Sequence, residues 1–535
     1  MDFMITLALM AATLTYAWRY VDFSIPPFED AAMLMRYAQN LAGGHGIVWN
    51  IGEAPVDGAT YFLFMTASAA LIKSGLTVGR EVRGIGFASH LLTVLLIYWA
   101  NRRIHHANVA VSLISGLYLA VGTGLSYVAA YFGTPFFALA AAVTWIFGLL
   151  LMRIPQSSIW LSLGFSMSGL ITGLIRPEGV ILAGLMMFAV VVRRGFRSSL
   201  NILIVFLLIF ISIGGIYFLW RWDYFGYPLP NPYYKKGDLD LHWDSFNNSL
   251  QNTLQLCLPV MVAFLLGFRT RATTRETVVH LIPIVGFASV FVLISDEMNF
   301  GSRFQYALMP IALISWYPLV HGIRPPWLET VGRRERIVSI ATLACLAAGV
   351  VYYSWYQNCF LTSFQRTCAS PYERDGRFEM GKLLAQYREK GYVIATTEAG
   401  LVPYYSGWTA IDTWGLNDPF IAHNGGITEE YLDRYQPHLI MFHDYYSPLV
   451  PPKLTEANLS QRWFSMTILL KTYAESNGYV LAAVFGDSPY DTNYFYVRPD
   501  FEDSQALIEQ ISSMRNYYWF TTGKRSINYA GYQQP

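Results

Sequence analysis

Two adjacent carboxylates, Glu29 and Asp30, stand at the start of a segment with helical periodicity over residues 29–42. A carboxylate within hydrogen-bond reach of a hydroxyl can accept its proton, so this pair could supply a general base. Two carboxylates side by side also tend to raise the pKa of one of them, which suits that role. The plainer interpretation is electrostatic, because the helix dipole favours acids at a helix N-terminus whether or not they have a function.

Side chains suited to holding a sugar follow the acidic pair along the chain. The predicted helix ends at Gly43-Gly44, a common C-terminal signal, and on it Arg36 and Asn40 share a face with Glu29. A loop rich in glycine and proline comes next. The candidates for binding acceptor hydroxyls are Asn40, Trp49, Glu53 and Asp57. The alternative is structural, since a single Trp is more often part of the packing and acids in such loops shape turns.

Positively charged side chains are the groups that would hold a phosphate, because Arg and Lys stabilise negative charge on phosphoryl oxygens. The candidates are Arg36, Arg176, Lys235, Lys236 and Arg303. Arg303 precedes an apolar segment, where it could meet a lipid phosphate or act as an interfacial anchor. Lys235 follows an aromatic-rich stretch, whose alternative role is a belt at the membrane interface. Glu178 lies close to Arg176, a spacing typical of an ion pair.

The elements that position these groups follow from a strongly apolar composition. Hydrophobic residues make up 54% of the 535 residues and charged residues 14%, whereas an average soluble domain carries about 25% charge. A soluble enzyme could not bury so much apolar surface, and disorder requires low hydrophobicity. With 37 basic and 36 acidic residues, the chain also lacks the basic excess of a nucleic-acid binder. The composition therefore predicts a membrane protein.

Charge-free stretches mark the membrane spans, because a spanning helix needs about 20 mostly apolar residues. No Asp, Glu, Lys or Arg occurs in 104–152, 154–175, 198–220, 245–268, 277–295, 304–323 or 337–365. Short basic loops mark the cytoplasmic side. They place residues 21–58 outside as the first external loop, after a first span over 3–20. About 11 spans fit this charge pattern, and the segment 59–76 is expected to be short, tilted or re-entrant.

Two domains are expected: a membrane domain over 1–365 and a soluble domain over 366–535 on the external side. In the second domain, a helix over 376–390 and apolar runs of strand length predict an α/β fold. The predicted strands are 392–397, 438–443, 479–485 and 493–498. The domain contains neither Gly-x-Gly-x-x-Gly nor a Walker A loop, so nucleotide binding has no support. Whether Cys359 and Cys368, which follow the last span, form a disulfide stays open.

The first external loop resembles that of a known family, the GT-C-fold membrane glycosyltransferases. The resemblance rests on Glu29-Asp30, then Arg36-Tyr37-Ala38-x-Asn40-Leu41-Ala42-x-Gly44-x-Gly46-x-Val48-Trp49-Asn50-x-Gly52-Glu53, then Val56-Asp57-Gly58-x-Thr60. Within that family, the terminal cell-wall arabinofuranosyltransferases are the most similar group. Shorter pieces agree in order: Arg176-Pro177-Glu178-Gly179, Ser302-Arg303-Phe304 and Gly415-Leu416-Asn417-Asp418. The family usually has two aspartates at the acidic pair, so Glu29 leaves open which carboxylate acts as the base.

The resemblance implies an enzyme that moves a sugar, arabinofuranose in the most similar group, from a polyprenyl phosphate to a glycan acceptor with inversion. It implies that Asp30 is the base and that Glu29 orients the acceptor or shares the proton. The residues expected to hold the donor phosphate are Arg303, Arg36 and Lys235. The residues expected to bind the acceptor are Glu53, Asp57, Asn40 and Trp49.

The expected partners are the polyprenyl-phosphate sugar, the glycan acceptor and the lipid bilayer, with no nucleic acid, and the expected location is the plasma (inner) membrane. No spacing of His, Cys and Asp resembles a structural zinc site, and no cofactor is expected. Because some relatives use a divalent cation with their acidic pair, a cation there stays open. Two other functions fit the sequence: a transporter or flippase for lipid-linked sugars, and a non-catalytic membrane scaffold that binds glycan. A transporter would more often show internal repeats, and no clear repeat is present.

Overall fold

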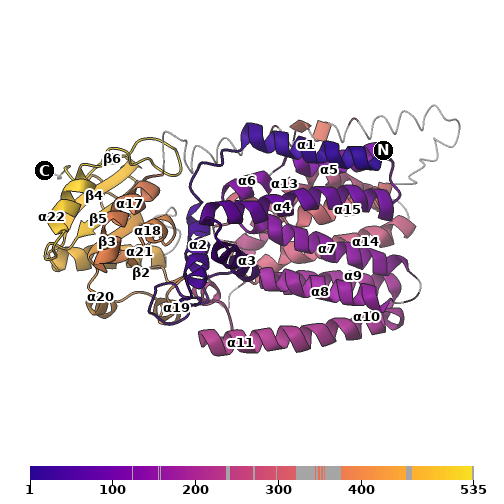
Figure 1. Cartoon of the computed structure of the whole chain (residues 1–535), viewed down its shortest axis with the longest axis horizontal. Helices are drawn as coiled ribbons and strands as arrows, with labels where there is room; N and C mark the ends of the chain where they lie inside the picture. Colours follow the sequence, from indigo (N-terminus) through magenta and orange to yellow (C-terminus); the bar gives the residue numbers. More distant parts are fainter. Residues whose placement is uncertain are drawn as a thin grey trace.

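The computed structural model describes residues 1–320 except 123, 155, 157, 237–240, 269–270 and 297, isolated positions between 344 and 359, and residues 375–532 except 454–460. The chain forms a bundle of helices and a C-terminal part built on a β-sheet, with helix α2 (Glu29–Ala42) between them (Figure 1). Cys368 and most of the charge-free stretch 337–365, where the last span is expected, lie outside the described residues.

The bundle consists of helices from the first 320 residues. They are α1 (Asp2–Tyr20), α3 (Phe62–Lys73), α4 (Val78–Trp99), α5 (Val109–Ala120), α6 (Gly124–Ala129), α7 (Thr134–Arg153), α8 (Ile159–Ile175), α9 (Glu178–Arg194), α10 (Phe196–Ile209), α11 (Gly215–Phe225), α12 (Asn231–Lys236), α13 (Trp243–Gly267), α14 (Arg271–Ser289) and α15 (Leu308–Val320). Small hydroxyl side chains inside the bundle have hydrogen-bond partners on neighbouring helices. The Thr144 and Thr172 hydroxyls meet at 3.1 Å between α7 and α8, and Trp145 Nε1 donates to Ser315 Oγ at 2.9 Å.

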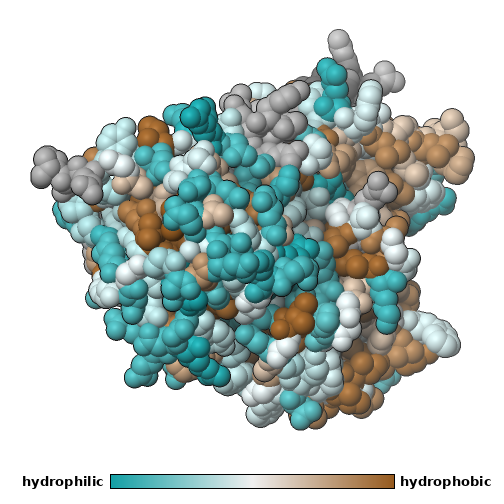
Figure 2. Space-filling model, turned by 60° about the vertical axis from the view of Figure 1, so that its left-hand side comes forward, coloured by the Kyte–Doolittle hydropathy of each residue, from teal (hydrophilic) through white to brown (hydrophobic). Residues whose placement is uncertain are grey.

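Among the residues that the structure describes, five helices are long and apolar enough to cross a membrane, or six if the bent α13 is one span. The segment Phe196–Phe225 is the most apolar of them. Only 11% of its apolar stretch is buried inside the protein, as expected for a helix that faces lipid. Figure 2 shows the contrast, with hydrophilic residues over the C-terminal part and hydrophobic residues gathered on the bundle. The chain is therefore a helical membrane protein, and the count of 11 spans stays a prediction. The segment expected to be short is α3, a helix of 12 residues.

The C-terminal part is a six-stranded mixed sheet in the order β2-β1-β3-β5-β4-β6. The strands are β1 (Val393–Thr396), β2 (Thr409–Asp412), β3 (Leu439–Asp444), β4 (Val480–Ser488), β5 (Asp491–Val497) and β6 (Ile527–Asn528). Strand β1 pairs in parallel with both β2 and β3, and the remaining pairs are antiparallel. From β1 the chain passes to β2 on one side and then crosses to β3 on the other side of β1. The carboxyl ends of β1 and β3 therefore form a topological switch point.

Helices cover both faces of this sheet. They are α17 (Gly376–Leu384), α18 (Leu401–Ser406), α19 (Pro419–His423), α20 (Glu429–Tyr435), α21 (Gln461–Ser476) and α22 (Ser504–Ser512). Successive strand residues point to opposite faces. In β3, Leu439 and Met441 pack with α17 and α22, whereas Ile440 and Phe442 pack with α20 and α21. The first of these two cores continues through α2 into the bundle, so the two parts share one apolar interior.

Candidate active site at the junction of the two parts

A cavity of about 410 Å³ opens beside the first turns of α2, a volume typical of small-ligand sites. Its wall comes from α2 and from the loops that precede α3, α7, α9, α12 and α15. Most of the lining is apolar or aromatic. The titratable side chains on the wall are Asp30, Tyr61, Tyr131, Arg176, Glu178, Tyr233, Lys236 and Arg303. An apolar cleft with a few charged groups at the edge of a helical bundle suits a ligand that is both lipid and anion.

Asp30 and Arg303 form an ion pair on this wall, between the first turn of α2 and the loop before α15. The Arg303 side chain is only 8% exposed, and its guanidinium lies 4.4 Å from the ring centre of Phe132 and 5.1 Å from that of Phe304. The Asp30 side chain is 24% exposed. Among the described residues, no acceptor hydrogen-bonds to Arg303 Nε. Arg303 therefore keeps a buried donor beyond the pair with Asp30.

A second cation on the wall, Arg176, is held in place by contacts with its neighbours. Its Nε donates to Glu178 Oε1 at 2.9 Å, and its Nη1 donates to the Tyr61 hydroxyl at 2.5 Å. The guanidinium also lies against the rings of Tyr61 and Phe304, at 4.5 and 4.7 Å. The ion pair expected between Arg176 and Glu178 is therefore present, and both of its partners lie on the cavity wall.

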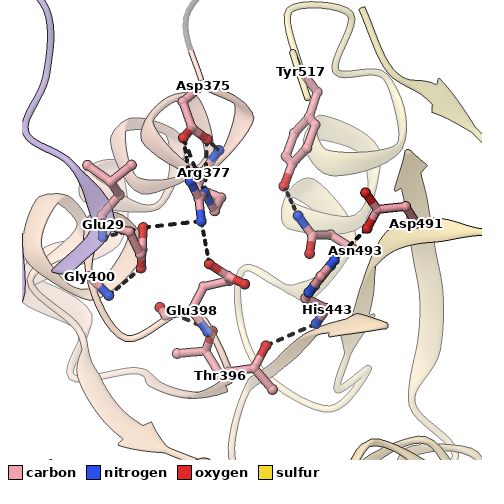
Figure 3. A network of polar contacts seen from close by, with 12 residues as sticks. Glu29, Asp375, Arg377, Thr396, Glu398, Gly400, His443, Asp491, Asn493 and Tyr517 are labelled. Carbon is pink, nitrogen blue, oxygen red and sulfur yellow. Dashed lines mark hydrogen bonds and ion pairs between the residues drawn. The ribbon is translucent and has the colours of Figure 1, made fainter. Parts of the chain in front are cut away.

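Glu29, the neighbour of Asp30, points to the C-terminal part and does not line the cavity. Its carboxylate accepts hydrogen bonds from Gly400 N and, at 3.1 Å, from Leu401 N at the start of α18 (Figure 3). Gly400 has to be glycine here, because a Cβ would lie 1.9 Å from the Glu29 carbonyl oxygen. This placement corrects the expectation that Glu29 handles the acceptor, since its oxygens hold the two parts of the chain together.

Three carboxylates surround one buried guanidinium at this junction (Figure 3). Arg377 Nη2 lies 2.7 Å from Asp375 and its Nη1 lies 2.7 Å from Glu398 and 3.8 Å from Glu29. Burial raises the pKa of Glu29 to about 8; Arg377 opposes this rise, and the charges of Glu398 and Asp375 add to it. One cation cannot balance three anions in a buried site, so Glu29 is the group that takes a proton.

This protonation makes stability depend on pH. Because the pKa of Glu29 is higher in the folded protein than its unfolded value of about 4.3, the folded state binds more protons between these values and loses stability as pH rises toward 8. We expect the Tm of the full chain in detergent to fall from pH 5 to pH 8 and then level off. Glu29→Gln should flatten this slope. Glu53→Gln, at an exposed carboxylate, should keep it; equal slopes in all three proteins would contradict the assignment.

The Arg36 side chain also forms hydrogen bonds across the junction of the two parts. Its Nε donates to Trp49 O at 2.8 Å, and its two terminal nitrogens donate to Pro403 O at 2.5 Å, Asn50 Oδ1 at 2.8 Å and Trp408 O at 2.9 Å. Four of its five N–H donors are thus used by backbone and amide oxygens. This geometry does not support Arg36 as a phosphate ligand; the residue ties α2 to the C-terminal part.

Asn40 and Trp49 have similar structural roles. Asn40 Nδ2 donates to Val48 O and Trp49 O, at 2.9 and 3.2 Å. The Trp49 ring is 2% exposed, and its Nε1 donates to Ala410 O at 2.9 Å on the open edge of β2. Covering an edge strand satisfies backbone groups that would otherwise be free. Neither side chain can reach a sugar in this arrangement, which corrects their assignment to the acceptor.

The remaining predicted residues do not line the cavity. Asp57 pairs with Arg221, and Glu53 is exposed and accepts from Asn50 Nδ2 at 2.8 Å. Lys235 points toward the ring of Trp414, 4.2 Å from its centre, whereas the next residue, Lys236, lines the cavity. Of the acidic pair and the three predicted phosphate ligands, the structure therefore brings together Asp30 and Arg303 only.

Two residues important to this geometry carry no signal in the sequence. Tyr61 meets Arg176 across 115 positions, and Arg377 meets Glu29 across 348, so neither partner could be inferred from spacing. Within the described residues, no group of three His, Cys, Asp or Glu side chains is arranged to hold a metal ion.

Solved structures share this fold. ArnT from Cupriavidus metallidurans bound to undecaprenyl phosphate superposes with a TM-score of 0.57 and 13% identity, over 91% of this chain and 97% of that chain. The Archaeoglobus fulgidus oligosaccharyltransferase gives 0.52 and 10%, over 92% of this chain and 74% of that one. The mycobacterial arabinofuranosyltransferase AftD gives 0.46 and 13%, over 93% and 41%. The ArnT and oligosaccharyltransferase structures confirm the predicted GT-C type of membrane fold.

Sequence comparisons add one finding. Residues 366–501 match a family model described as a domain of unknown function (DUF8728). No curated protein sequence matches the chain.

Proposed function

We propose that this protein is a membrane glycosyltransferase that moves a sugar from a polyprenyl-phosphate donor to a hydroxyl of a glycan acceptor. The observation that carries the proposal is the ion pair of Asp30 and Arg303 on the wall of an apolar cavity. The shared fold supports it, since ArnT with that fold was solved with undecaprenyl phosphate. The external side of the membrane is the proposed location of the cavity and of the C-terminal part.

The donor phosphate would lie against Arg303, with Arg176 and Lys236 near it. Arg303 is suited to this contact because it is buried, always charged and, among the described residues, has an Nε–H without an acceptor. A phosphate in the cavity would compete with Asp30 for the guanidinium. Its arrival would therefore leave the Asp30 carboxylate available to accept a proton.

The reaction follows from these positions. The acceptor oxygen forms a bond with the anomeric carbon while its proton passes to Asp30. The bond between that carbon and the phosphate oxygen breaks, and its electron pair leaves with the polyprenyl phosphate. Arg303 stabilises the charge that develops on the phosphate. Configuration inverts, because the acceptor enters opposite the leaving phosphate. The proposal leaves the sugar to experiment; arabinofuranose is the first to test.

The experiment is a transfer assay on the purified full chain. We expect at least one member of a panel of decaprenyl- or undecaprenyl-phosphate sugars, including arabinofuranose, mannose and glucose, to lose its sugar to a glycan acceptor, read by mass spectrometry. Release of free polyprenyl phosphate should match the sugar transferred. Movement of intact lipid-linked sugar across vesicles without transfer would instead identify a flippase, and no reaction with any donor would favour a glycan-binding scaffold.

A further inference from the structure

Glu178 lines the same cavity as Asp30, and these two are the carboxylates among its described lining residues. The guanidiniums of Arg176 and Arg303 both contact the Phe304 ring, at 4.7 and 5.1 Å from its centre. The ion pair of Arg176 and Glu178 therefore lies at the same ring as Arg303, where the donor phosphate is proposed to bind. Because the sugar is joined directly to that phosphate, it would lie near both ion pairs.

A tight turn between α8 and α9 fixes the position of Glu178. It is the first residue of α9, and the N–H of the next residue, Gly179, donates to Arg176 O at 2.9 Å. Gly179 has to be glycine, because a Cβ would lie 2.2 Å from Thr172 O near the end of α8. The start of α9 thus packs directly on α8, and this contact holds the Glu178 backbone at the cavity wall.

The ion pair with Arg176 uses only one of the two carboxylate oxygens of Glu178. Arg176 Nε and Nη2 both donate to Oε1, the first at 2.9 Å, whereas Nη1 donates to the Tyr61 hydroxyl. No side chain or backbone group among the described residues hydrogen-bonds to Oε2. An arginine and a carboxylate frequently form two parallel hydrogen bonds that engage both oxygens. Here one acceptor oxygen stays available.

The helix dipole and Arg176 together account for an acid at the start of α9, but they do not account for this oxygen. A donor lipid that fills the cavity would displace the water around Oε2. The oxygen would then be an unpaired buried acceptor, which is costly, unless the donor itself supplies a hydrogen bond. A carboxylate paired with arginine accepts hydrogen bonds and donates none. A sugar hydroxyl fits this need, whereas an acidic group on the sugar would be repelled.

We propose that Glu178 recognises the donor sugar. Its Oε2 accepts a hydrogen bond from a hydroxyl of a neutral sugar, while Arg303 holds the phosphate to which that sugar is joined. This inference rests on the proposed transferase function and adds the group that selects its donor. A site that hydrogen-bonds a substrate hydroxyl rejects an analogue without it, because the polar group of the site is left unpaired.

Binding of lipid-linked sugars to the full chain in detergent tests this assignment independently of catalysis. The probes are decaprenyl-phosphoryl arabinofuranose, undecaprenyl-phosphoryl mannose and undecaprenyl-phosphoryl glucose. Each is compared with the methyl diester of the same polyprenyl phosphate, which has the same charge but no sugar. We expect at least one probe to bind about 10- to 10²-fold more tightly than its methyl diester, the range for a hydrogen bond to a charged group. Equal binding within every pair would overturn the proposal.

Two variants assign this gain to one side chain. Glu178→Gln should remove most of the gain in affinity that the sugar provides, without weakening the binding of the methyl diester. Glu430→Gln, at an exposed carboxylate of α20, should change neither affinity. A gain that persists undiminished in Glu178→Gln would show that another group holds the sugar.

Because Glu178→Gln also leaves Arg176 without its counter-ion, a second measurement changes the ligand instead. In the unsubstituted protein, removing the hydroxyls of the tightest probe one at a time should weaken binding about 10- to 10²-fold at one position. That deoxy analogue and its parent should bind Glu178→Gln about equally, the coupling expected of a direct contact. Equal binding of all the deoxy analogues to the unsubstituted protein would contradict the assignment. If no donor were a substrate for transfer, this discrimination would still be measurable, so the two proposals can fail separately.

Discussion

Sugar transfer by an Asp30→Asn variant is expected to fall about 10²- to 10⁴-fold, the range for loss of a general base. Asparagine has nearly the same shape as aspartate and can still accept a hydrogen bond from Arg303, but it cannot take the acceptor proton. The expected loss is in kcat, and the KM for the donor should not rise, because Arg303 holds the phosphate and a neutral asparagine competes less with it for the guanidinium. Initial rates over a range of donor concentrations measure both quantities.

Glu29→Gln is the informative comparison for this experiment. If Asp30 is the base, Glu29→Gln at pH 6 should keep most of the turnover, because Glu29 faces α18 and carries a proton at that pH. Glu430→Gln supplies the control at an exposed carboxylate of α20, outside the cavity. Undiminished transfer by Asp30→Asn, in a sample whose size-exclusion profile and Tm equal those of the parent protein, would refute the assignment of the base.

Arg303→Gln is expected to lower kcat/KM for the donor about 10²- to 10³-fold, as the loss of a preorganised group that stabilises developing charge does. Undecaprenyl phosphate, the leaving lipid, should also lose most of its power to inhibit the reaction, whereas undecaprenol should inhibit both proteins equally weakly. Arg303→Lys should recover part of the activity, since it keeps the charge but loses the planar set of donors.

The control for Arg303 has to separate binding from folding, because the substitution also leaves Asp30 without its ion-pair partner. Arg271→Gln removes an exposed arginine at the start of α14, outside the cavity, and should leave kinetics and Tm unchanged. If Arg303→Gln retained full inhibition by undecaprenyl phosphate, the donor would have to bind elsewhere.

The regular elements of this fold are visible in the sequence where a local pattern decides them. The helix predicted over 29–42 is α2, and the four predicted strands coincide with β1, β3, β4 and β5 to within a few residues. Strand β2 escaped prediction because its four residues give too short a pattern. The edge of this strand is covered by Trp49 and Asn50, whose side chains donate hydrogen bonds to Ala410 O. These residues lie about 360 positions earlier in the chain.

The site is less predictable from the sequence, because partners far away in the chain decide where each of its side chains points. Glu29 and Asp30 look equivalent in the sequence, yet successive residues on a helix point in directions about 100° apart. One of them faces Arg303 and the other faces Gly400, 371 positions away. Arg36 and Trp49 likewise appear suited to ligands, and only the docking of residues 403–410 shows that they are buried.

Glu29 and Asp30 are joined by a single peptide bond, although one holds the C-terminal part and the other faces Arg303. The position of the proposed base is therefore not independent of how that part is seated. A displacement of the C-terminal part would be passed to Asp30 through the hydrogen bonds between α18 and Glu29. Since a shift of about 1 Å in a reacting group can cost about 10²-fold in rate, turnover by the proposed transferase depends on how the C-terminal part is seated against α2.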